Sequence, residues 1–440
     1  MSTRFHSVRL DKDKCKGCTN CLKHCPTEAI RVRGGRARIL DERCVDCGQC
    51  IRICQYHAKI AMTDPFDDIF KYKHRIAVPA PSLYGQFRHL ENIGIVLDAL
   101  ISIDFDEVFE VARAADIATR AIQERLRLSD RPRPLISSAC PTITRIIQVR
   151  FPSLIEHIIN VRQPVEIAAA MARQEYARKH NVSPDEIGVF FITPCAAKMT
   201  AIRNPIGQAK SDIDGAISMA DVFGRLVPHV TGAIQAKRVP TATPYGVGWA
   251  NAGGEIHAAT PRNSMSVDGV ENVIRVLEEI EDGKLTDLDY FEGAACPGGC
   301  VGGPLTVEIN YVAQNTIKTL RDALPEAHPS NAVSSAQMNA VPLHFDQKIE
   351  PNNAMRLDES IAGAIDRMEH MNAILERLPG YDCGACGSPT CESFAEDIVR
   401  GFCTEMDCIH LLKARLEEMA LKVEDLAPDN PEPVRKPSAT

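Results

Sequence analysis

The chain has 440 residues, of which 45% are hydrophobic and 25% are charged, which allows two or three globular domains with buried cores. Its net charge of -8 and its single tryptophan argue against a nucleic-acid-binding surface. Residues 1–14 are polar and partly basic, and no later stretch is long and apolar enough to cross a bilayer. We therefore expect a cytoplasmic protein with neither a nucleic acid nor a membrane as partner.

The 17 cysteines are unusually numerous for a protein of a reducing compartment, where disulfides do not persist. They form one group at residues 15–54, another at residues 383–408, and four isolated positions between them. Metal binding explains this distribution better than a disulfide framework does.

The first group is an internal repeat. Residues 15–26 read CKGCTNCLKHCP and residues 44–54 read CVDCGQCIRIC. In this spacing three thiolates hold one cluster and the fourth cysteine reaches across to the other, whereas zinc sites pair two CxxC hooks at longer separation. The repeat resembles bacterial-type ferredoxins. It predicts two [4Fe-4S] clusters, one held by Cys15, Cys18, Cys21 and Cys54 and the other by Cys25, Cys44, Cys47 and Cys50.

Beyond about residue 73, apolar strands alternate with helical stretches, which indicates an α/β core. Cys140, Cys195 and Cys296 each follow an apparent strand, at the strand end where open α/β sheets collect ligands. One such cysteine is more often a small hydrophobic residue, but three in the same setting predict a shared metal site. The pattern predicts strands at 74–80, 105–111, 134–137 and 187–193, and helices at 112–127 and 164–180.

Three segments carry a more specific signal: SSACP at 137–141, PCAAK at 194–198 and EGAACPGGCVGGP at 292–304. They resemble the three signature segments of [FeFe] hydrogenases. The resemblance implies an H-cluster, in which a [4Fe-4S] cubane is joined to a two-iron subsite carrying CO, cyanide and a dithiolate. Its expected ligands are Cys140, Cys195, Cys296 and the bridging Cys300, with Lys198 and Ser82 donating hydrogen bonds to the two cyanides.

The glycines of the third segment have a predicted role of their own. Gly298, Gly299, Gly302 and Gly303 are expected because only glycine lets a backbone approach a large cofactor so closely.

Other positions depart from the family pattern. The high-activity members move protons through cysteine and glutamate side chains, and here alanine or isoleucine stands at those places. We therefore predict slow H2 cleavage, to two protons and two electrons, in a sensory or regulatory protein. The departures are Ala139 for the cysteine, Ala201, Ala121 and Ile122 for glutamates, and Thr193 and Ala294 for methionines.

Two alternatives remain open: a hydrogenase subunit of a redox complex, and an iron-sulfur electron carrier without the two-iron subsite. The expected partners are H2 and protons, maturation proteins that install the cofactor, and a redox partner or a signalling kinase or phosphatase that receives the output.

The last cysteine group lies in PGYDCGACGSPTC at 379–391 and in the DC that ends at residue 408. It resembles a small [4Fe-4S] domain of anaerobic redox proteins, with Cys383, Cys386, Cys391 and Cys408 as ligands and Cys403 left over. Apolar residues then recur in steps of three and four from Ile409 to Val423 and Leu426. They predict either a coiled-coil seam, and with it a homodimer, or a helix packed on its own domain.

These patterns divide the chain into four parts. They are a ferredoxin-like 2[4Fe-4S] domain at 1–70, a two-lobed α/β H-cluster domain at 71–372, a small helical [4Fe-4S] domain at 373–410, and an amphipathic helix with a disordered, proline-rich tail at 411–440.

Overall fold

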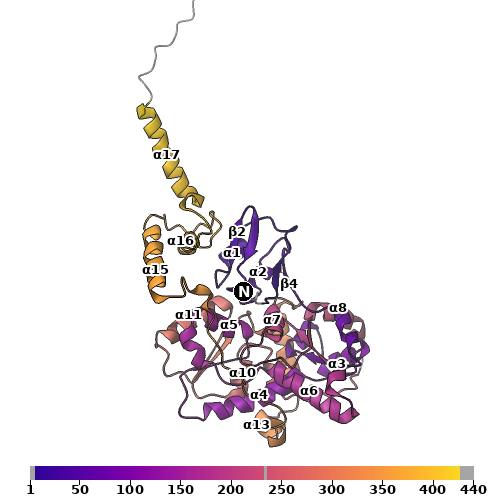
Figure 1. Ribbon diagram of the computed structural model, residues 1–440. Coiled ribbons are helices and arrows are strands. Elements are labelled where there is room, and N and C mark those ends of the chain that lie inside the picture. Colours follow the sequence, from indigo (N-terminus) through magenta and orange to yellow (C-terminus); the bar gives the residue numbers. More distant parts are fainter. Residues whose placement is uncertain (1–4, 232–234, 427–440) are drawn as a thin grey trace, which may run out of the picture. The chain divides into compact units, whose positions relative to one another are not determined.

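A computed structural model describes residues 5–231 and 235–426, with side chains as far as residue 422 (Figure 1). The chain divides into two compact units. The large unit contains the N-terminal segment up to Cys15, His24–Ala29 and Ile39–Met355, and the small unit contains Lys16–Lys23, Ile30–Arg38 and the chain from Arg356 onward. The ferredoxin repeat therefore contributes residues to both units. Within the described part of the chain, no helix is both long and apolar enough to cross a bilayer.

The first sheet of the large unit is parallel and four-stranded. Every residue of its strand β8 is buried, as expected of a parallel strand covered on both faces. Strand β8 and helix α6 have the predicted bounds, and α4 begins one residue early. The strand order is β6 (Glu107–Val108), β5 (His74–Pro79), β8 (Ile187–Thr193) and β9 (Gly215–Ser218), and the main helices around it are α3 (Ile93–Ser102), α4 (Val111–Leu126), α6 (Pro164–His180) and α8 (Met219–Val230).

The predicted strand at 105–111 is largely wrong. Only Glu107 and Val108 pair with β5, because the chain enters helix α4 at Val111.

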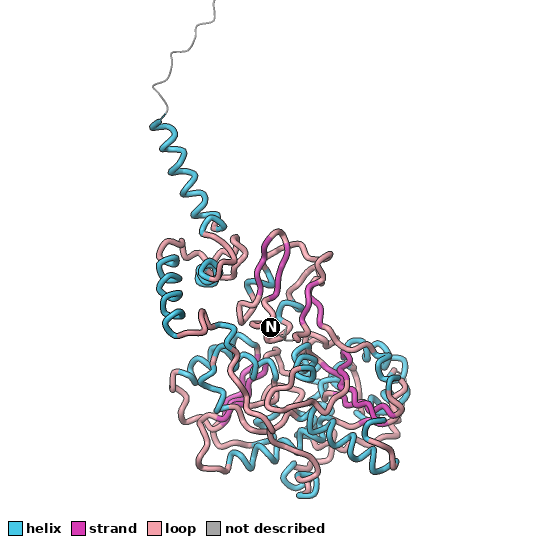
Figure 2. The backbone as a smooth tube through the Cα atoms, in the orientation of Figure 1, coloured by secondary structure: helices cyan, strands magenta, loops and turns pink. Residues whose placement is uncertain are grey.

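The second sheet is also parallel and has three strands, and Figure 2 draws the strands of both sheets in magenta. Its presence confirms an α/β fold with two lobes. The order is β10 (Ser264–Asp268), β11 (Tyr290–Ala294) and β7 (Leu135–Ile136), packed with α5 (Pro141–Arg150) and α11 (Val270–Glu281). Further helices of the unit are α7 (Ala196–Arg203), α9 (Pro244–Gly248), α10 (Gly254–Ala259), α12 (Asn310–Asp322), α13 (Pro329–Ala332) and α14 (Ser335–Met338).

The ferredoxin repeat is visible in the backbone. Gly17 and Asp46 occupy equivalent places in the two copies and have φ of 69° and 53°, and Glu28 and His57 both have φ of 49°. The Sγ atoms of Cys25 and Cys54 each accept a backbone N–H four residues later, at 3.2 and 3.3 Å. The copies carry α1 (Asn20–Lys23) and α2 (Gln49–Arg52), and strands β1 (Val8–Leu10) and β4 (Lys59–Ala61) pair antiparallel.

The small unit contains the hairpin β2 (Ile30–Arg33) and β3 (Arg36–Ile39, whose last residue belongs to the large unit) and three longer helices, α15 (Ile361–Leu375), α16 (Cys391–Val399) and α17 (Ile409–Leu426). Its core gathers Met371, Ile374, Leu378, Phe394, Ala395 and Cys408.

The apolar seam of α17 is exposed at Ile409, Leu412, Leu416 and Met419. The first turn of the helix nevertheless contacts its own domain, because Leu411 packs against the core of the small unit and the ring of His410 lies against Tyr381. The side chains of Val423 and Leu426, and the predicted tail at 427–440, lie outside the described residues.

Candidate active site

The four isolated cysteines all lie in the large unit, where strands give way to helices or tight turns. Cys140 follows β7 as the N-cap of α5, and Cys195 follows β8 as the N-cap of α7. Cys296 comes just after β11, and Cys300 opens a short 3₁₀ helix. Helix N-termini favour negative charge, so two of these positions suit thiolates bound to metal.

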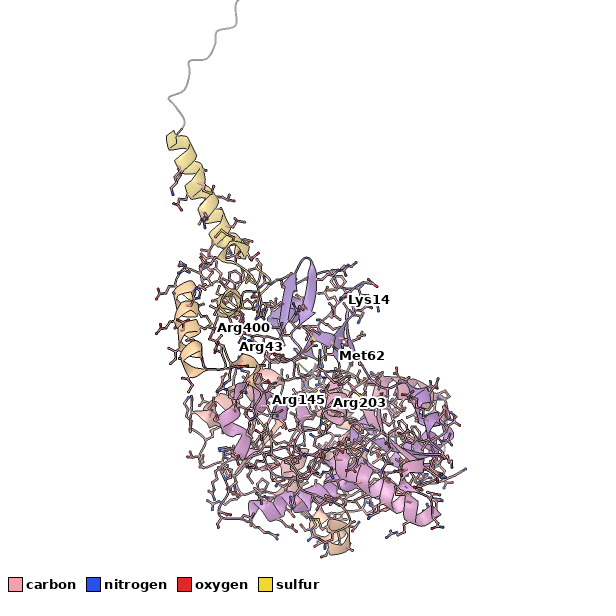
Figure 3. All side chains as sticks on the ribbon, viewed as in Figure 1. Lys14, Arg43, Met62, Arg145, Arg203 and Arg400 are labelled. Carbon is pink, nitrogen blue, oxygen red and sulfur yellow. The ribbon has the colours of Figure 1, made fainter. Side chains whose placement is uncertain are left out.

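A buried arginine links the two helices that begin at cysteines. Arg145 of α5 is fully buried, and its guanidinium donates to the carbonyl oxygen of Asn204, directly after α7, at 2.9 Å. Figure 3 labels Arg145 together with Arg203, the last residue of α7. This contact fixes the helix bearing Cys140 relative to the helix bearing Cys195.

The four sulfur atoms are close enough to affect one another electrostatically. Burial, and then the Cys296 thiolate, raises the pKa of Cys195 to about 12. The pKa of Cys300 is also raised, first by desolvation and then by Cys195, Cys140 and Cys296. Cys300 has an accessible surface even though protein surrounds it, because it lines a cavity. The structure thus brings together all four predicted ligands of the cubane.

The cavity beside these sulfurs has a volume of about 110 Å³. Within the described structure, three buried polar atoms at or next to it have no protein partner: Ser82 Oγ, Trp249 Nε1 and Asn251 Oδ1. Trp249 and Asn251 line the cavity, and Ser82 directly follows the lining residue Pro81. Buried polar groups are normally hydrogen-bonded, so these atoms fit a bound group with polar ligands of its own. The residues present therefore suit an H-cluster.

Lys198 lines the same cavity. Its ammonium donates to the carbonyl oxygen of Ala139 at 3.0 Å and to Gln163 Oε1 at 2.7 Å. An ammonium has three protons, so one more hydrogen bond is available to a ligand in the cavity.

The glycines of the third signature segment also allow close packing between parts of the protein. A Cβ atom at Gly299 would lie 2.4 Å from the backbone nitrogen of Ala252, and one at Gly303 would lie 2.2 Å from the carbonyl oxygen of Pro194. At Gly302 the obstacle is the carbonyl oxygen of Pro297, and at Gly298 it is the side chain of Gln314. A side chain at these positions would therefore collide with neighbouring protein atoms, and the predicted close approach to a cofactor stays a prediction.

At the positions that depart from the family pattern, the side chains are either apolar or hydrogen-bonded within the protein. Ala139 and Ala294 line the cavity, whereas Ala121 and Ile122 are buried in the core around α4. Ala201 is buried on α7. The hydroxyl of Thr193 donates to the carbonyl oxygen of Cys195 at 2.9 Å.

Two buried carboxyl groups at the cavity were missed by sequence reasoning. Glu255 accepts hydrogen bonds from Ser137 Oγ at 2.6 Å and from the hydroxyl of Tyr290. Glu292 accepts from the backbone nitrogens of Gly253 and Ile256, at 2.8 and 3.0 Å. Burial raises the pKa of both carboxyl groups, and the charge of Glu255 raises that of Glu292 further. The sequence signals were a glutamate after a glycine pair, for Glu255, and the first position of the third signature segment, for Glu292.

The second predicted ferredoxin cluster also has its ligands near one another in the large unit. Burial raises the pKa of Cys44 and Cys47, and in each case Cys25 and Cys50 raise it further. Cys296 also contributes to the raised pKa of Cys47, so this group lies within electrostatic reach of the four isolated cysteines.

The first predicted ferredoxin cluster remains a prediction, because its expected ligands are divided between the two units. Cys15 and Cys54 belong to the large unit, whereas Cys18 and Cys21 belong to the small unit.

The C-terminal cysteines gather in the small unit. Burial, and then Cys383 and Cys408, raises the pKa of Cys386. Cys391 opens helix α16. Cys403 lies nearby, and burial raises its pKa to about 11.

Comparison with known protein families places these observations in context. The model of the C-terminal domain of the iron-only hydrogenase large subunit matches residues 73–260 and 235–304, together more than half of the chain. The chain belongs to the iron-only hydrogenase large-subunit family. A 4Fe-4S dicluster domain matches residues 7–55, and a domain described as a putative Fe-S cluster matches residues 378–410. Multiple iron-sulfur clusters are therefore expected on family grounds as well.

The characterised relatives share little sequence identity with this chain. The periplasmic [Fe] hydrogenase large subunit of Nitratidesulfovibrio vulgaris is 23% identical over 367 residues, covering 68% of this chain and 86% of that protein. Iron hydrogenase 1 of Clostridium pasteurianum is 22% identical over 373 residues, covering 68% and 65%. A solved structure of the [FeFe] hydrogenase HydA1 from Chlamydomonas reinhardtii aligns with a TM-score of 0.48 and 17% identity, over 66% of this chain and 96% of that one.

Proposed function

We propose that this protein binds an H-cluster and cleaves or senses H2, acting slowly in a sensory or regulatory role. The single observation that carries the proposal is that Cys140, Cys195 and Cys300 line one cavity and that Cys296 lies within electrostatic reach of Cys195 and Cys300. When bound, the H-cluster supplies the iron site at which H2 is split into two protons and two electrons.

The chain's own residues hold and orient the cofactor in this proposal. The four cysteines bind iron through their thiolates. Ser82 and Lys198 offer hydrogen-bond donors at the cavity, and the apolar neighbours Ala139 and Ala294 exclude water there. Bonds that are made in a cavity shielded from water are stronger than the same bonds in solvent.

Slow turnover is supported by the missing cysteine at Ala139 and the apolar Ala121 and Ile122. Glu255 and Glu292 modify that expectation, because they are buried carboxyl groups at the same cavity. The pKa of Glu292 is raised to about 8, so this group can hold a proton near neutral pH, whereas the pKa of Glu255 is raised only to about 6. We infer that they give the protein a proton path, so that H2 chemistry is slowed but retained.

The remaining components are part of the same proposal. The ferredoxin-type clusters and the C-terminal cluster carry electrons to a redox partner or to a signalling kinase or phosphatase, and maturation proteins install the cofactor in the cytoplasm. A hydrogenase subunit of a redox complex is the alternative for the same chemistry.

Exchange between D2 and water tests whether the matured protein reacts with hydrogen. We expect exchange in the unmodified chain and in Cys403→Ala, which removes a thiol with no assigned cluster, and none in Cys300→Ala. Absence of exchange in a chain with a full iron content would contradict the proposal. Equal exchange in Cys300→Ala would contradict it too.

A further inference from the structure

A buried ionic cluster joins the ferredoxin hairpin to the C-terminal iron-sulfur segment within the small unit. Arg31 of β2 donates through Nε to Asp397 Oδ2 at 2.6 Å, and both side chains are at least 95% buried. Arg33 donates to the same oxygen at 3.0 Å, and Ser388 Oγ donates to it at 2.6 Å. Both arginines thus pair with the carboxylate of Asp397.

The same strand contacts the loop that carries Cys386. Arg33 donates to the carbonyl oxygen of Cys386 at 2.9 Å and to Ser388 Oγ at 3.2 Å. The backbone nitrogen of Val32 donates to the carbonyl oxygen of Gly387 at 2.9 Å. Gly387 has φ of 84°, and a Cβ atom there would lie 1.8 Å from the carbonyl oxygen of Val32. The loop is thus shaped to receive this strand, and Arg33 is held against it by two hydrogen bonds.

Arg33 also brings its charge close to a predicted cluster ligand. Its guanidinium lies 2.9 Å from the carbonyl oxygen of Cys386. A cation near thiolates stabilises whichever state of a bound cluster has the greater negative charge. Reduction of a [4Fe-4S] cluster adds one negative charge, so a nearby guanidinium raises the reduction potential.

The first helix of the ferredoxin segment, α1, also contacts the C-terminal iron-sulfur segment. Lys23, the last residue of α1, donates to the carbonyl oxygen of Pro389 at 2.9 Å. Helix α1 carries Cys21, and Pro389 lies between Cys386 and Cys391. The two cysteine-bearing segments are therefore in direct contact.

We propose that Arg33 is a positioning residue that raises the reduction potential of the C-terminal cluster and so favours electron flow toward it from the ferredoxin clusters. One electron passes, which oxidises the donor cluster and reduces the C-terminal cluster, and no proton or other reactant is needed. The inference rests on the C-terminal cluster of the proposed function and is independent of the H-cluster.

A redox titration of the full-length protein, followed by electron paramagnetic resonance, tests this role. The C-terminal signal is identified by its loss in Cys386→Ala. We expect Arg33→Gln to lower the midpoint potential of that signal. Arg33→Lys keeps the charge, so its midpoint potential should stay closer to that of the unmodified protein. Arg36→Gln removes an exposed charge from the same hairpin and should leave the potential unchanged. An unchanged potential in Arg33→Gln, or an equal shift in Arg36→Gln, would overturn the inference.

If Arg33→Gln fails to retain the cluster, a substitution that changes the local charge in the opposite direction tests the inference instead. Asp397→Asn removes a negative charge from the ionic cluster and should raise the same potential, and an unchanged or lowered value overturns the inference. Infrared bands of CO and cyanide report separately on the H-cluster. A failure of the proposed hydrogen chemistry is thereby distinguished from a failure of the role of Arg33.

Discussion

Glu255 and Glu292 line the same cavity as Cys140 and Cys300, and the negative charge of Glu255 raises the pKa of Glu292. In the described structure, the hydrogen bonds of both carboxyl groups come from neutral donors. Glu255 accepts from hydroxyl groups and Glu292 from backbone nitrogens. The two carboxyl groups thus lie at the cavity where the proposed function would need proton transfer, although the side chains at the positions expected for a proton relay are apolar.

Glu255→Gln and Glu292→Gln should each lower D2 exchange by about 100-fold, because each removes a proton-carrying group. The infrared bands should stay in place, since neither residue is a proposed ligand. The exposed Glu271→Gln is the matched control and should keep full exchange. Exchange that is unaffected in both cavity variants would show that protons travel another way.

The pH profile gives a second test of the pair. Loss of the Glu255 charge removes one cause of the raised pKa of Glu292, so that pKa should fall. The ionisation seen in the exchange rate of Glu255→Gln should therefore move to lower pH than in the unmodified protein. A shift to higher pH would contradict this electrostatic relationship.

Ser82→Ala should shift a cyanide band in the infrared spectrum, because it removes a buried hydroxyl that has no protein partner. The free energy of unfolding should change by less than about 1 kcal/mol, since no intramolecular hydrogen bond is lost. Ser102→Ala, at an exposed position, is the control. An unshifted spectrum in Ser82→Ala would remove this residue from the site.

Ala139→Cys should raise turnover by less than about tenfold. The new thiol would face the cavity, but Ala121 and Ile122 remain apolar and buried, so the rest of a cysteine-based relay is missing. Steady-state H2 oxidation with an artificial electron acceptor measures the change. A rise of about 100-fold or more would mean that the relay is otherwise intact.

The exposed seam of α17 leads us to expect a homodimer. Leu416 lies in the middle of the seam and Glu417 beside it, so Leu416→Glu should give a monomer while Glu417→Gln remains dimeric. Size-exclusion chromatography with light scattering measures both. A monomeric unmodified protein, or a dimeric Leu416→Glu, would contradict dimerisation through this helix.

Local patterns predicted the scaffold of the site well. The apolar run of β8 and the proline that opens α6 gave correct bounds, because burial and the first-turn preference of proline act over short stretches. The strand ends at Cys140, Cys195 and Cys296 followed from the same signals. Ser82 and Lys198 needed the family resemblance, because a serine in a turn and a lysine on a helix carry no distinctive local pattern.

Contacts between distant segments were beyond the reach of sequence patterns. Glu255 and Glu292 meet at one cavity only through the packing of α10 near β11. The contact of Arg33 with Cys386 joins residues 353 positions apart. The close packing of Gly299 on Ala252 could not be predicted for the same reason, because Ala252 comes from another loop.

Infrared spectroscopy of the matured protein tests the central claim most directly. If the four mid-chain thiolates hold an H-cluster, metal-bound CO and cyanide bands appear in the unmodified protein and are lost in Cys300→Ala. A matured protein with its iron-sulfur clusters in place and no such bands would contradict the claim, and would leave a chain that only carries electrons.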